Sequence, residues 1–117
     1  MKNYINSLNK KFNHEVIYDM REYAQSNKVP IINDEGLIFI NQLIRLKKPC
    51  HILEIGTAIG YSAINMALSY ERAFIDTIEK NPHLAKIARD NINKINLDKR
   101  IKVFEEDALE ININLLK

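Results

Sequence analysis

The sequence predicts an α/β fold in which N-terminal helices precede a sheet of three parallel strands. Three short segments rich in aliphatic residues, 52–55, 73–79 and 101–104, read as strands, and segments with helical spacing of apolar residues separate them. The connections are short, which favours parallel strands joined by right-handed helical crossovers. A carboxylate stands at or just beyond the end of each predicted strand.

Length and composition set the class of protein. The chain has 117 residues, of which 46% are hydrophobic and 27% charged, and this balance is typical of a globular domain. We expect one domain over 1–117, with helices in 1–48 and the sheet in 49–117. No apolar run is long enough to span a bilayer, and no signal-peptide core is present, so we expect a cytoplasmic protein without a membrane partner. The single cysteine, Cys50, excludes an intramolecular disulfide and is expected to be a small buried hydrophobe.

Two amphipathic helices are predicted at the N-terminus. Apolar residues recur at three- and four-residue spacing over 1–12 and again over 16–24. We expect both helices to pack on the domain or on a second subunit, with their lysines on the polar side. A direct role of these lysines in RNA binding is the alternative.

A third helix is predicted to start at Asn33 or Asp34, because either side chain can cap it and Pro30 keeps the preceding residue extended. Apolar side chains cover most of its surface over 37–46, so we expect it to be well buried. The segment 47–49 ends it.

The stretch from Glu54 to Ser62 is predicted to run from a strand through a tight turn into a helix. Gly56 can adopt a backbone conformation closed to other residues, and Gly60 would let the helix lie close to its strand and leave its first N–H groups free. The glycine spacing is not that of the dinucleotide fingerprint, and Glu54 would repel a phosphate. A ligand with a cationic group and a carboxylate fits better, its carboxylate bound by turn amides such as that of Thr57 and by Ser62. An ordinary tight turn is the alternative.

Two further helices are predicted between the strands. Ala63, Ile64, Ala67 and Leu68 form the expected core face of the first. The second starts at 81–82, where an asparagine can cap it and a proline can take its first position.

Carboxylates are predicted to gather at one edge of the sheet. Glu79 lies nineteen residues after Gly60, close to the roughly 20-residue offset at which an acidic side chain binds ribose hydroxyls in such units. The alternative interpretation is that Glu79 is an ordinary residue at the end of a strand and faces solvent. The carboxyl ends of parallel strands meet at one edge, where ligands of such sheets bind, so Glu54, Glu79 and Asp107 should lie side by side.

The motifs resemble a known family. The run 53–63 resembles motif I of class I S-adenosylmethionine-dependent methyltransferases, and its Gly60-Tyr61-Ser62 ending is similar to the catechol and caffeoyl-CoA O-methyltransferase branch. The segment 34–36 with the apolar helix after it also resembles that branch. The resemblance is strongest to bacterial O-methyltransferases that include tRNA hydroxyuridine methyltransferase.

That resemblance implies a Rossmann-like sheet and methyl transfer from S-adenosylmethionine to a hydroxyl. The acceptor would be 5-hydroxyuridine in tRNA, with small catechol-like phenols as the alternative. It also implies a divalent metal such as magnesium. We further expect a homodimer, which could form through the N-terminal helices. The cofactor site that the resemblance implies comprises Glu54, Gly56, Thr57, Gly60 and Ser62 around the methionine part, Glu79 at the ribose, and Asp107 and Ala108 at the adenine.

The sequence departs from the family at two places. Glu106 stands where the family usually has glycine, and the metal-binding aspartate of the next strand would lie beyond residue 117. We therefore expect the N-terminal half of a larger domain, without catalytic or metal-binding residues, inactive alone and with the edge of strand 52–55 uncovered. His14, His51 and His83 lack the spacing of a metal site.

Two other functions remain open. One is a non-catalytic cofactor-binding fragment that associates through its N-terminal helices. The other is a dehydrogenase-like nucleotide binder, against which the position of Glu54 and the missing middle glycine argue.

Overall fold

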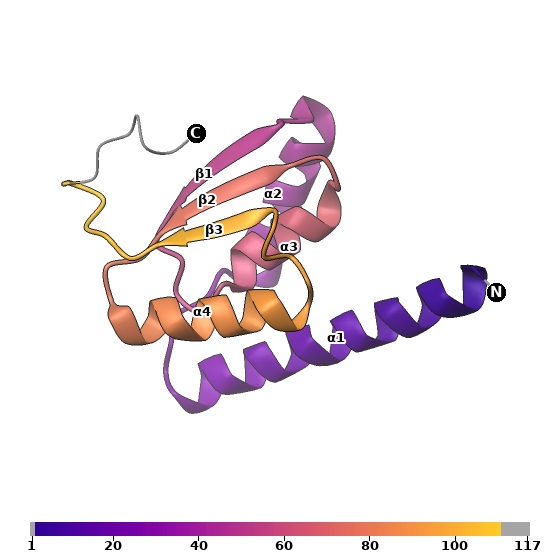
Figure 1. Ribbon diagram of the computed structural model, residues 1–117, viewed down its shortest axis with the longest axis horizontal. Coiled ribbons are helices and arrows are strands. Elements are labelled where there is room, and N and C mark those ends of the chain that lie inside the picture. Colours follow the sequence, from indigo (N-terminus) through magenta and orange to yellow (C-terminus); the bar gives the residue numbers. More distant parts are fainter. Residues whose placement is uncertain (1, 111–117) are drawn as a thin grey trace.

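The computed structural model describes residues 2–110 of the chain, with the side chains described from residue 10 onward. Helices and strands follow one another in the α/β order that the sequence predicts (Figure 1). The elements are α1 (Lys2–Ser26), α2 (Asp34–Lys47), β1 (His51–Ile55), α3 (Tyr61–Ser69), β2 (Phe74–Ile78), α4 (Pro82–Lys94) and β3 (Ile101–Phe104).

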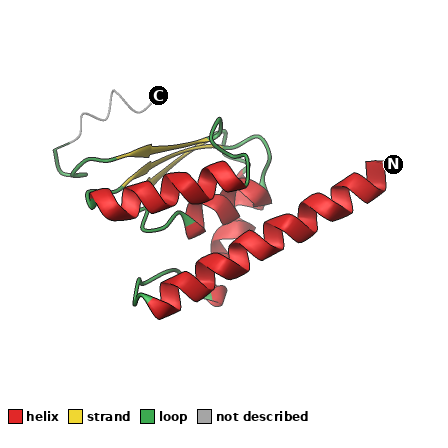
Figure 2. Cartoon of the chain, turned by 60° about the horizontal axis from the view of Figure 1, so that its bottom comes forward, coloured by secondary structure: helices red, strands yellow, loops and turns green. Residues whose placement is uncertain are grey.

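The three strands form a parallel sheet in the order β1-β2-β3, as predicted. The pairing places Glu54 opposite Thr77 and Ile78 opposite Phe104. Right-handed crossovers that advance in one direction put their helices on the same side of a sheet. The crossover helices α3 and α4 accordingly lie on one side of it, and α1 and α2 lie on that side too (Figure 2).

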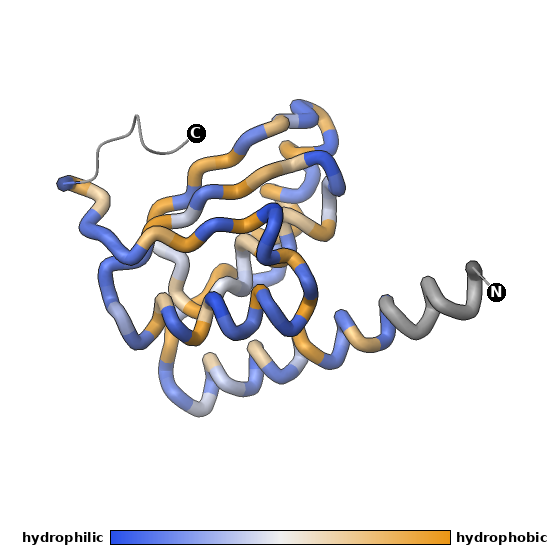
Figure 3. The backbone as a smooth tube through the Cα atoms, in the orientation of Figure 1, coloured by the Kyte–Doolittle hydropathy of each residue, from blue (hydrophilic) through white to orange (hydrophobic). Residues whose placement is uncertain are grey.

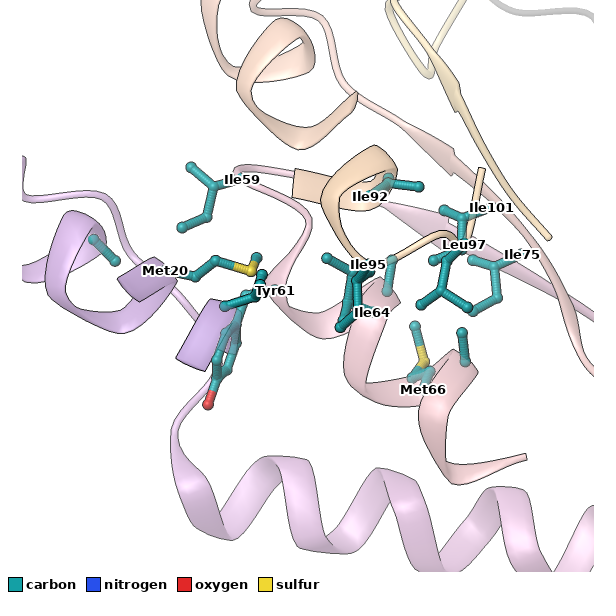
Figure 4. Close-up of a cluster of buried hydrophobic side chains, with 14 of the residues drawn as sticks. Met20, Ile59, Tyr61, Ile64, Met66, Ile75, Ile92, Ile95, Leu97 and Ile101 are labelled. Carbon is teal, nitrogen blue, oxygen red and sulfur yellow. The ribbon is translucent and has the colours of Figure 1, made fainter. Parts of the chain in front are cut away.

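The core lies between the sheet and these helices. Buried side chains of α3, α4 and the strands meet there (Figure 4), and most residues of the strands are hydrophobic (Figure 3). Ala63, Ile64 and Ala67 are buried as predicted for the core face of α3, but Leu68 is 41% exposed. The largest fully buried side chains are Ile59, Ile64, Ile75, Ile92 and Thr77.

The N-terminus forms one helix rather than the two that the sequence predicts. α1 has 25 residues and runs unbroken through 13–15, because that stretch contains neither glycine nor proline. Among its side chains from residue 10 onward, the buried hydrophobic ones are Val16, Met20 and Ala24. The first half extends beyond the rest of the chain (Figures 1 and 2).

α2 has the predicted ends but not the predicted burial. The Asn33 side chain accepts a hydrogen bond from the Gly36 N–H at 2.7 Å, and Lys48 closes the helix in the left-handed conformation. Only Ile44 is buried, because α2 packs on α3 along one side alone. The exposed apolar residues of α2 are Ile38, Phe39, Leu43 and Leu46.

The edge of the sheet formed by β1 has no further strand paired with it within residues 2–110. β1 pairs there only with β2, and Leu53 and Ile55 are exposed, in line with the uncovered edge expected from the sequence. Cys50, expected to be buried, is exposed because it immediately precedes this edge strand. None of the described helices is both long and apolar enough to cross a membrane.

Arg100 ties the end of α3 to the sheet. Its guanidinium donates to the carbonyls of Ala67 at 2.9 Å, Tyr70 at 2.6 Å and Ala73 at 3.0 Å. The last carbonyls of a helix have no partner within the helix, so this side chain satisfies groups that would otherwise need water. Burial lowers the pKa of Arg100, and the nearby charge of Glu71 opposes that shift.

We expect Arg100→Ala to lower the free energy of unfolding by about 1–3 kcal/mol, because three carbonyls lose a charged donor. Urea denaturation followed by circular dichroism measures the change. Lys99→Ala, which removes a neighbouring exposed cation, is the matched control and should change stability by less than about 0.5 kcal/mol. Equal losses in both variants would contradict this role of Arg100.

Candidate functional site

The predicted site residues gather at the carboxyl ends of the strands. Gly56, Glu79, Asp107 and Ala108 line one shallow hollow of about 160 Å³, together with Ile55, Ile78, Lys80 and Glu106. Glu54, Thr57, Gly60 and Ser62 lie next to it, on the end of β1 and in the turn that leads to α3.

Glu54 is held by hydroxyl groups from two other elements. Its Oε2 accepts from the Ser62 hydroxyl at 2.5 Å and its Oε1 from the Thr77 hydroxyl at 2.6 Å. The hydroxyl oxygens of Thr57 and Thr77 lie 2.7 Å apart. Because Thr77 gives its only proton to Glu54, Thr57 donates to Thr77. The end of β1, the turn, α3 and β2 are thus joined in one network.

The burial of Glu54 has an electrostatic consequence. Desolvation raises the pKa of this carboxyl above its usual value of 4.5, and the hydrogen bonds from Ser62 and Thr77 partly offset the rise. A partly buried carboxylate of this kind favours a cationic neighbour, which restores part of the stabilisation that water would give its charge.

Glu79 joins the turn to the start of α4. Its Oε1 accepts from the Ala58 N–H at 2.9 Å and its Oε2 from the Asn81 N–H at 3.1 Å. Ala58 is in the left-handed conformation, with a φ of 50°, and this bond helps to hold it there. Each carboxylate oxygen keeps a second lone pair, so Glu79 can still accept from a ligand.

The two glycines of the turn have different surroundings. Gly56 has a φ of 92°, and a Cβ built there would have no heavy atom within 4 Å, so the backbone faces open space. Gly60 has a φ of 88°, and its Cβ would lie 3.4 Å from Ala88. The close approach that Gly60 permits is therefore to α4 and not, as expected from the sequence, between α3 and its own strand.

Most amides of the turn are already bonded. The N–H groups of Gly56 and Thr57 both donate to the Ile78 carbonyl, at 2.8 and 3.3 Å. The sequence analysis expected turn amides to bind the carboxylate of the ligand. The Gly56 and Thr57 amides are not free to do so. The first N–H groups of α3 have no partner within the helix and are the available donors. They belong to Tyr61, Ser62 and Ala63.

The segment after β3 closes the other side of the hollow. The Glu106 N–H donates to the Glu79 carbonyl at 3.1 Å, which ties this segment to the end of β2. Asp107 Oδ1 accepts from the Leu109 N–H at 3.0 Å, so its other oxygen remains available.

No histidine is among the residues that line this hollow. His51 is at the opposite ends of the strands, where its Nε2 lies 2.7 Å from Asp76 Oδ2. Among the described residues, no group of three or more His, Cys, Asp or Glu side chains is placed to hold a metal ion.

Sequence reasoning missed Thr77. It is fully buried and contacts both Glu54 and Thr57, yet in the sequence it is one β-branched residue inside a strand. Only the register of β1 against β2, which places Thr77 opposite Glu54, reveals its role.

A family model described as O-methyltransferase matches residues 6–117. The chain belongs to this O-methyltransferase family. Its fold agrees, because class I members have the Rossmann-like parallel sheet seen here.

Solved structures share this fold. A Staphylococcus aureus protein designated a candidate caffeoyl-CoA O-methyltransferase is 36% identical, with a TM-score of 0.77 over 93% of this chain and 52% of its own. An O-methyltransferase from Bacillus cereus, solved with S-adenosylhomocysteine, is 28% identical, with a TM-score of 0.73 over 82% of this chain and 45% of its own.

Two curated relatives match a shorter part of the chain. A protein-L-isoaspartate O-methyltransferase from Methanocella arvoryzae is 36% identical over 59% of this chain, and a catechol O-methyltransferase from Niastella koreensis is 32% identical over 62% of it. This family member spans 37% and 34% of those relatives and about half of the solved structures.

We expect stability to depend on pH through Glu54. Because its folded pKa is raised above 4.5, the folded state binds the proton more tightly than the unfolded state does. The stabilisation is full below pH 4.5 and is lost as the pH rises through the folded pKa. Relative to Glu54→Gln, the wild type should therefore gain stability as the pH falls.

Chemical denaturation between pH 4 and pH 7.5 would measure this difference. Ser62→Ala removes a bond that lowers the pKa of Glu54 and should move the transition to higher pH. A difference between wild type and Glu54→Gln that stays constant with pH would show that Glu54 is not the titrating group.

Proposed function

We propose that this chain is the cofactor-binding half of an S-adenosylmethionine-dependent O-methyltransferase. The observation that carries the proposal is the pair of carboxylates, Glu54 and Glu79, held at the ends of adjacent parallel strands on either side of the glycine turn. Membership of the O-methyltransferase family supports it, as does the similar fold of the Bacillus cereus enzyme that was solved with S-adenosylhomocysteine.

The methionine part of the cofactor fits beside Glu54. Its ammonium group would compensate the buried carboxylate, whose oxygens keep free lone pairs. Its carboxylate would bind the free N–H groups at the start of α3, where the helix dipole favours an anion. In this arrangement Ser62 and Thr77 orient Glu54, Thr57 holds the Thr77 hydroxyl, and Gly56 and Gly60 give the turn its shape.

The nucleoside part fits the hollow. Glu79 would accept from the two ribose hydroxyls, and Asp107 and Ala108 would meet the adenine edge. Gly56 leaves the space above the turn open, so the ribose can approach the backbone.

Bound S-adenosylmethionine supplies an electrophilic methyl group, and the chain's part is to hold it in line with an oxygen nucleophile. We assign no catalytic residue within 2–110 and expect no turnover by this chain alone. The resemblance implies magnesium, but the described residues offer no ligand group for it, so we derive no step through the metal. We also propose a homodimer.

We propose a hydroxyl of an RNA nucleotide, such as 5-hydroxyuridine in tRNA, as the methyl acceptor. A large RNA substrate would also reach Lys99 and Lys102, which line a hollow of about 210 Å³ with Phe74 at the amino ends of the strands and would contact the RNA outside the methylated nucleotide. Cations and an exposed aromatic ring are typical of surfaces that bind single-stranded nucleic acid. A catechol-like phenol is the second candidate, supported by the curated catechol O-methyltransferase relative.

We expect S-adenosylhomocysteine to bind the chain and to shift amide NMR signals of Gly56 and Ser62. Glu79→Gln keeps an acceptor for the Ala58 N–H but loses the charge, and should weaken binding at least about tenfold in calorimetry, or about 1.4 kcal/mol. Glu22→Gln, an exposed carboxylate on α1, is the matched control and should leave binding unchanged. A well-dispersed spectrum that is indifferent to the ligand would refute the cofactor assignment.

The acceptor class can be tested by binding to the cofactor-saturated chain. A fluorescently labelled anticodon stem-loop should bind with an affinity that falls steeply with salt, because phosphate contacts release counterions. Lys99→Glu/Lys102→Glu should weaken that binding at least about tenfold. Catechol binding without RNA binding would favour the phenol acceptor instead.

A further inference from the structure

A groove runs between the second half of α1 and α4, which lie beside each other (Figure 1). Its volume is about 330 Å³, within the range of about 300–1,000 Å³ that is usual for small-molecule sites. Val16, Met20 and Ile87 give it an apolar lining, and Tyr23 adds an aromatic ring. The groove therefore has the size and the lining of a site for one small molecule.

Asn91 of α4 is the most deeply buried polar residue of this lining. It is 8% exposed, and its Nδ2 donates to the Ile59 carbonyl at 2.9 Å. Among the described side chains and backbone, no donor is bonded to its Oδ1, and this atom is not sealed from solvent. A side-chain amide oxygen can accept two hydrogen bonds. The groove thus contains an acceptor that is free for a ligand.

The charges around the groove balance one another. Asp19 of α1 and Asp90 and Lys94 of α4 line it, and Lys86 forms an ion pair with Asp90 at 3.2 Å. All four side chains are exposed, so two carboxylates stand with two ammonium groups in contact with water. The groove therefore favours neither an anionic nor a cationic ligand.

The same stretch of α4 holds the glycine turn. Ile59, whose carbonyl Asn91 binds, is fully buried in the turn between Ala58 and Gly60. One turn earlier on α4, Ala88 lies 3.4 Å from the position of a Cβ built on Gly60. A change in the position or freedom of Asn91 is therefore passed directly to the backbone of the turn.

We propose that the α1–α4 groove is a regulatory site for an uncharged aromatic molecule that carries one N–H or O–H donor. The ring packs against Met20, Tyr23 and Ile87, since a thioether and an aromatic ring are favourable partners for it. Its donor bonds to Asn91 Oδ1, which fixes the amide that holds the Ile59 carbonyl. The ligand site is independent of the cofactor, whereas its regulatory effect rests on the proposed function.

Other ligand classes fit the groove less well. A purely apolar ligand would cover Asn91 Oδ1 without bonding to it, and a buried acceptor without a partner is costly. A charged ligand would find no net countercharge in the lining. An aromatic ring with one donor satisfies the acceptor and fills the apolar space.

Indole is the probe, and 1-methylindole, which has the same ring system but no N–H, is its matched control. In an NMR titration of the chain, indole should shift amide signals of residues that line the groove and also that of Ile59. We expect 1-methylindole to bind at least about fivefold more weakly, because it leaves Asn91 Oδ1 without a donor.

Variants of α4 locate the site. Ile87→Trp places a ring in the groove from a half-buried position and should weaken indole binding at least about tenfold. Leu68→Trp, which adds the same ring to a partly exposed position of α3 outside the groove, is the matched control and should bind indole normally.

Asn91→Leu removes the acceptor and should give indole and 1-methylindole equal affinities, as a double-mutant cycle requires. It also removes the donor to the Ile59 carbonyl. If this variant unfolds, Ile87→Trp and the two ligands still test the site, because they leave that bond in place.

The regulatory effect is measured with S-adenosylhomocysteine. Saturating indole should tighten its binding at least about fivefold, and S-adenosylhomocysteine should tighten indole binding by the same factor, because such coupling is reciprocal. Failure of S-adenosylhomocysteine to bind at all would refute the proposed function, while the effect of indole on the Ile59 signal would still report on the groove and its link to the turn.

Three results would overturn the ligand site. They are a chain that does not bind indole, an Ile87→Trp variant that binds it as well as the wild type does, and equal affinities of the wild type for indole and 1-methylindole. A chain that binds both indole and S-adenosylhomocysteine, each without effect on the other, would overturn the regulatory role.

Discussion

The hydrogen-bonded carboxylate of Glu54 is the interaction on which the site depends. It joins the end of β1 to β2 through Thr77 and to the first turn of α3 through Ser62. The parallel register makes this possible, because it places Thr77 directly opposite Glu54. Glu79 repeats the arrangement one strand further on, where it holds Ala58 of the same turn and the first residues of α4. The turn is therefore fixed from both sides before any ligand binds, and the entropic cost of ordering it is not borne by binding.

Under the proposed function, this arrangement exchanges stability for binding. A carboxyl group whose pKa is raised by burial destabilises the folded state at neutral pH, relative to a neutral side chain of the same shape. The same desolvation strengthens its attraction for a cation, because few water molecules compete. An ammonium group beside Glu54 would lower its pKa again, so cofactor binding and ionisation of this residue support each other. Stored electrostatic energy of this kind is common at functional sites.

Local signals in the sequence predicted the elements that depend on local chemistry. Asn33 and Asn81 cap their helices as their positions suggested, and both glycines of the turn have positive φ. The features that were missed depend on tertiary contacts. The role of Thr77 follows from strand register, and the exposed face of α2 follows from its packing mainly on α3; neither is encoded in the pattern of one segment. The site assignments themselves remain predictions, because they concern a ligand.

α4 connects the glycine turn to the groove beside α1. At its start, Asn81 meets Glu79, and further along Ala88 supports Gly60 of the turn. One turn later, Asn91 lines the groove beside α1 while its Nδ2 donates to the Ile59 carbonyl at 2.9 Å. This buried amide therefore links the wall of the groove to the backbone of the turn.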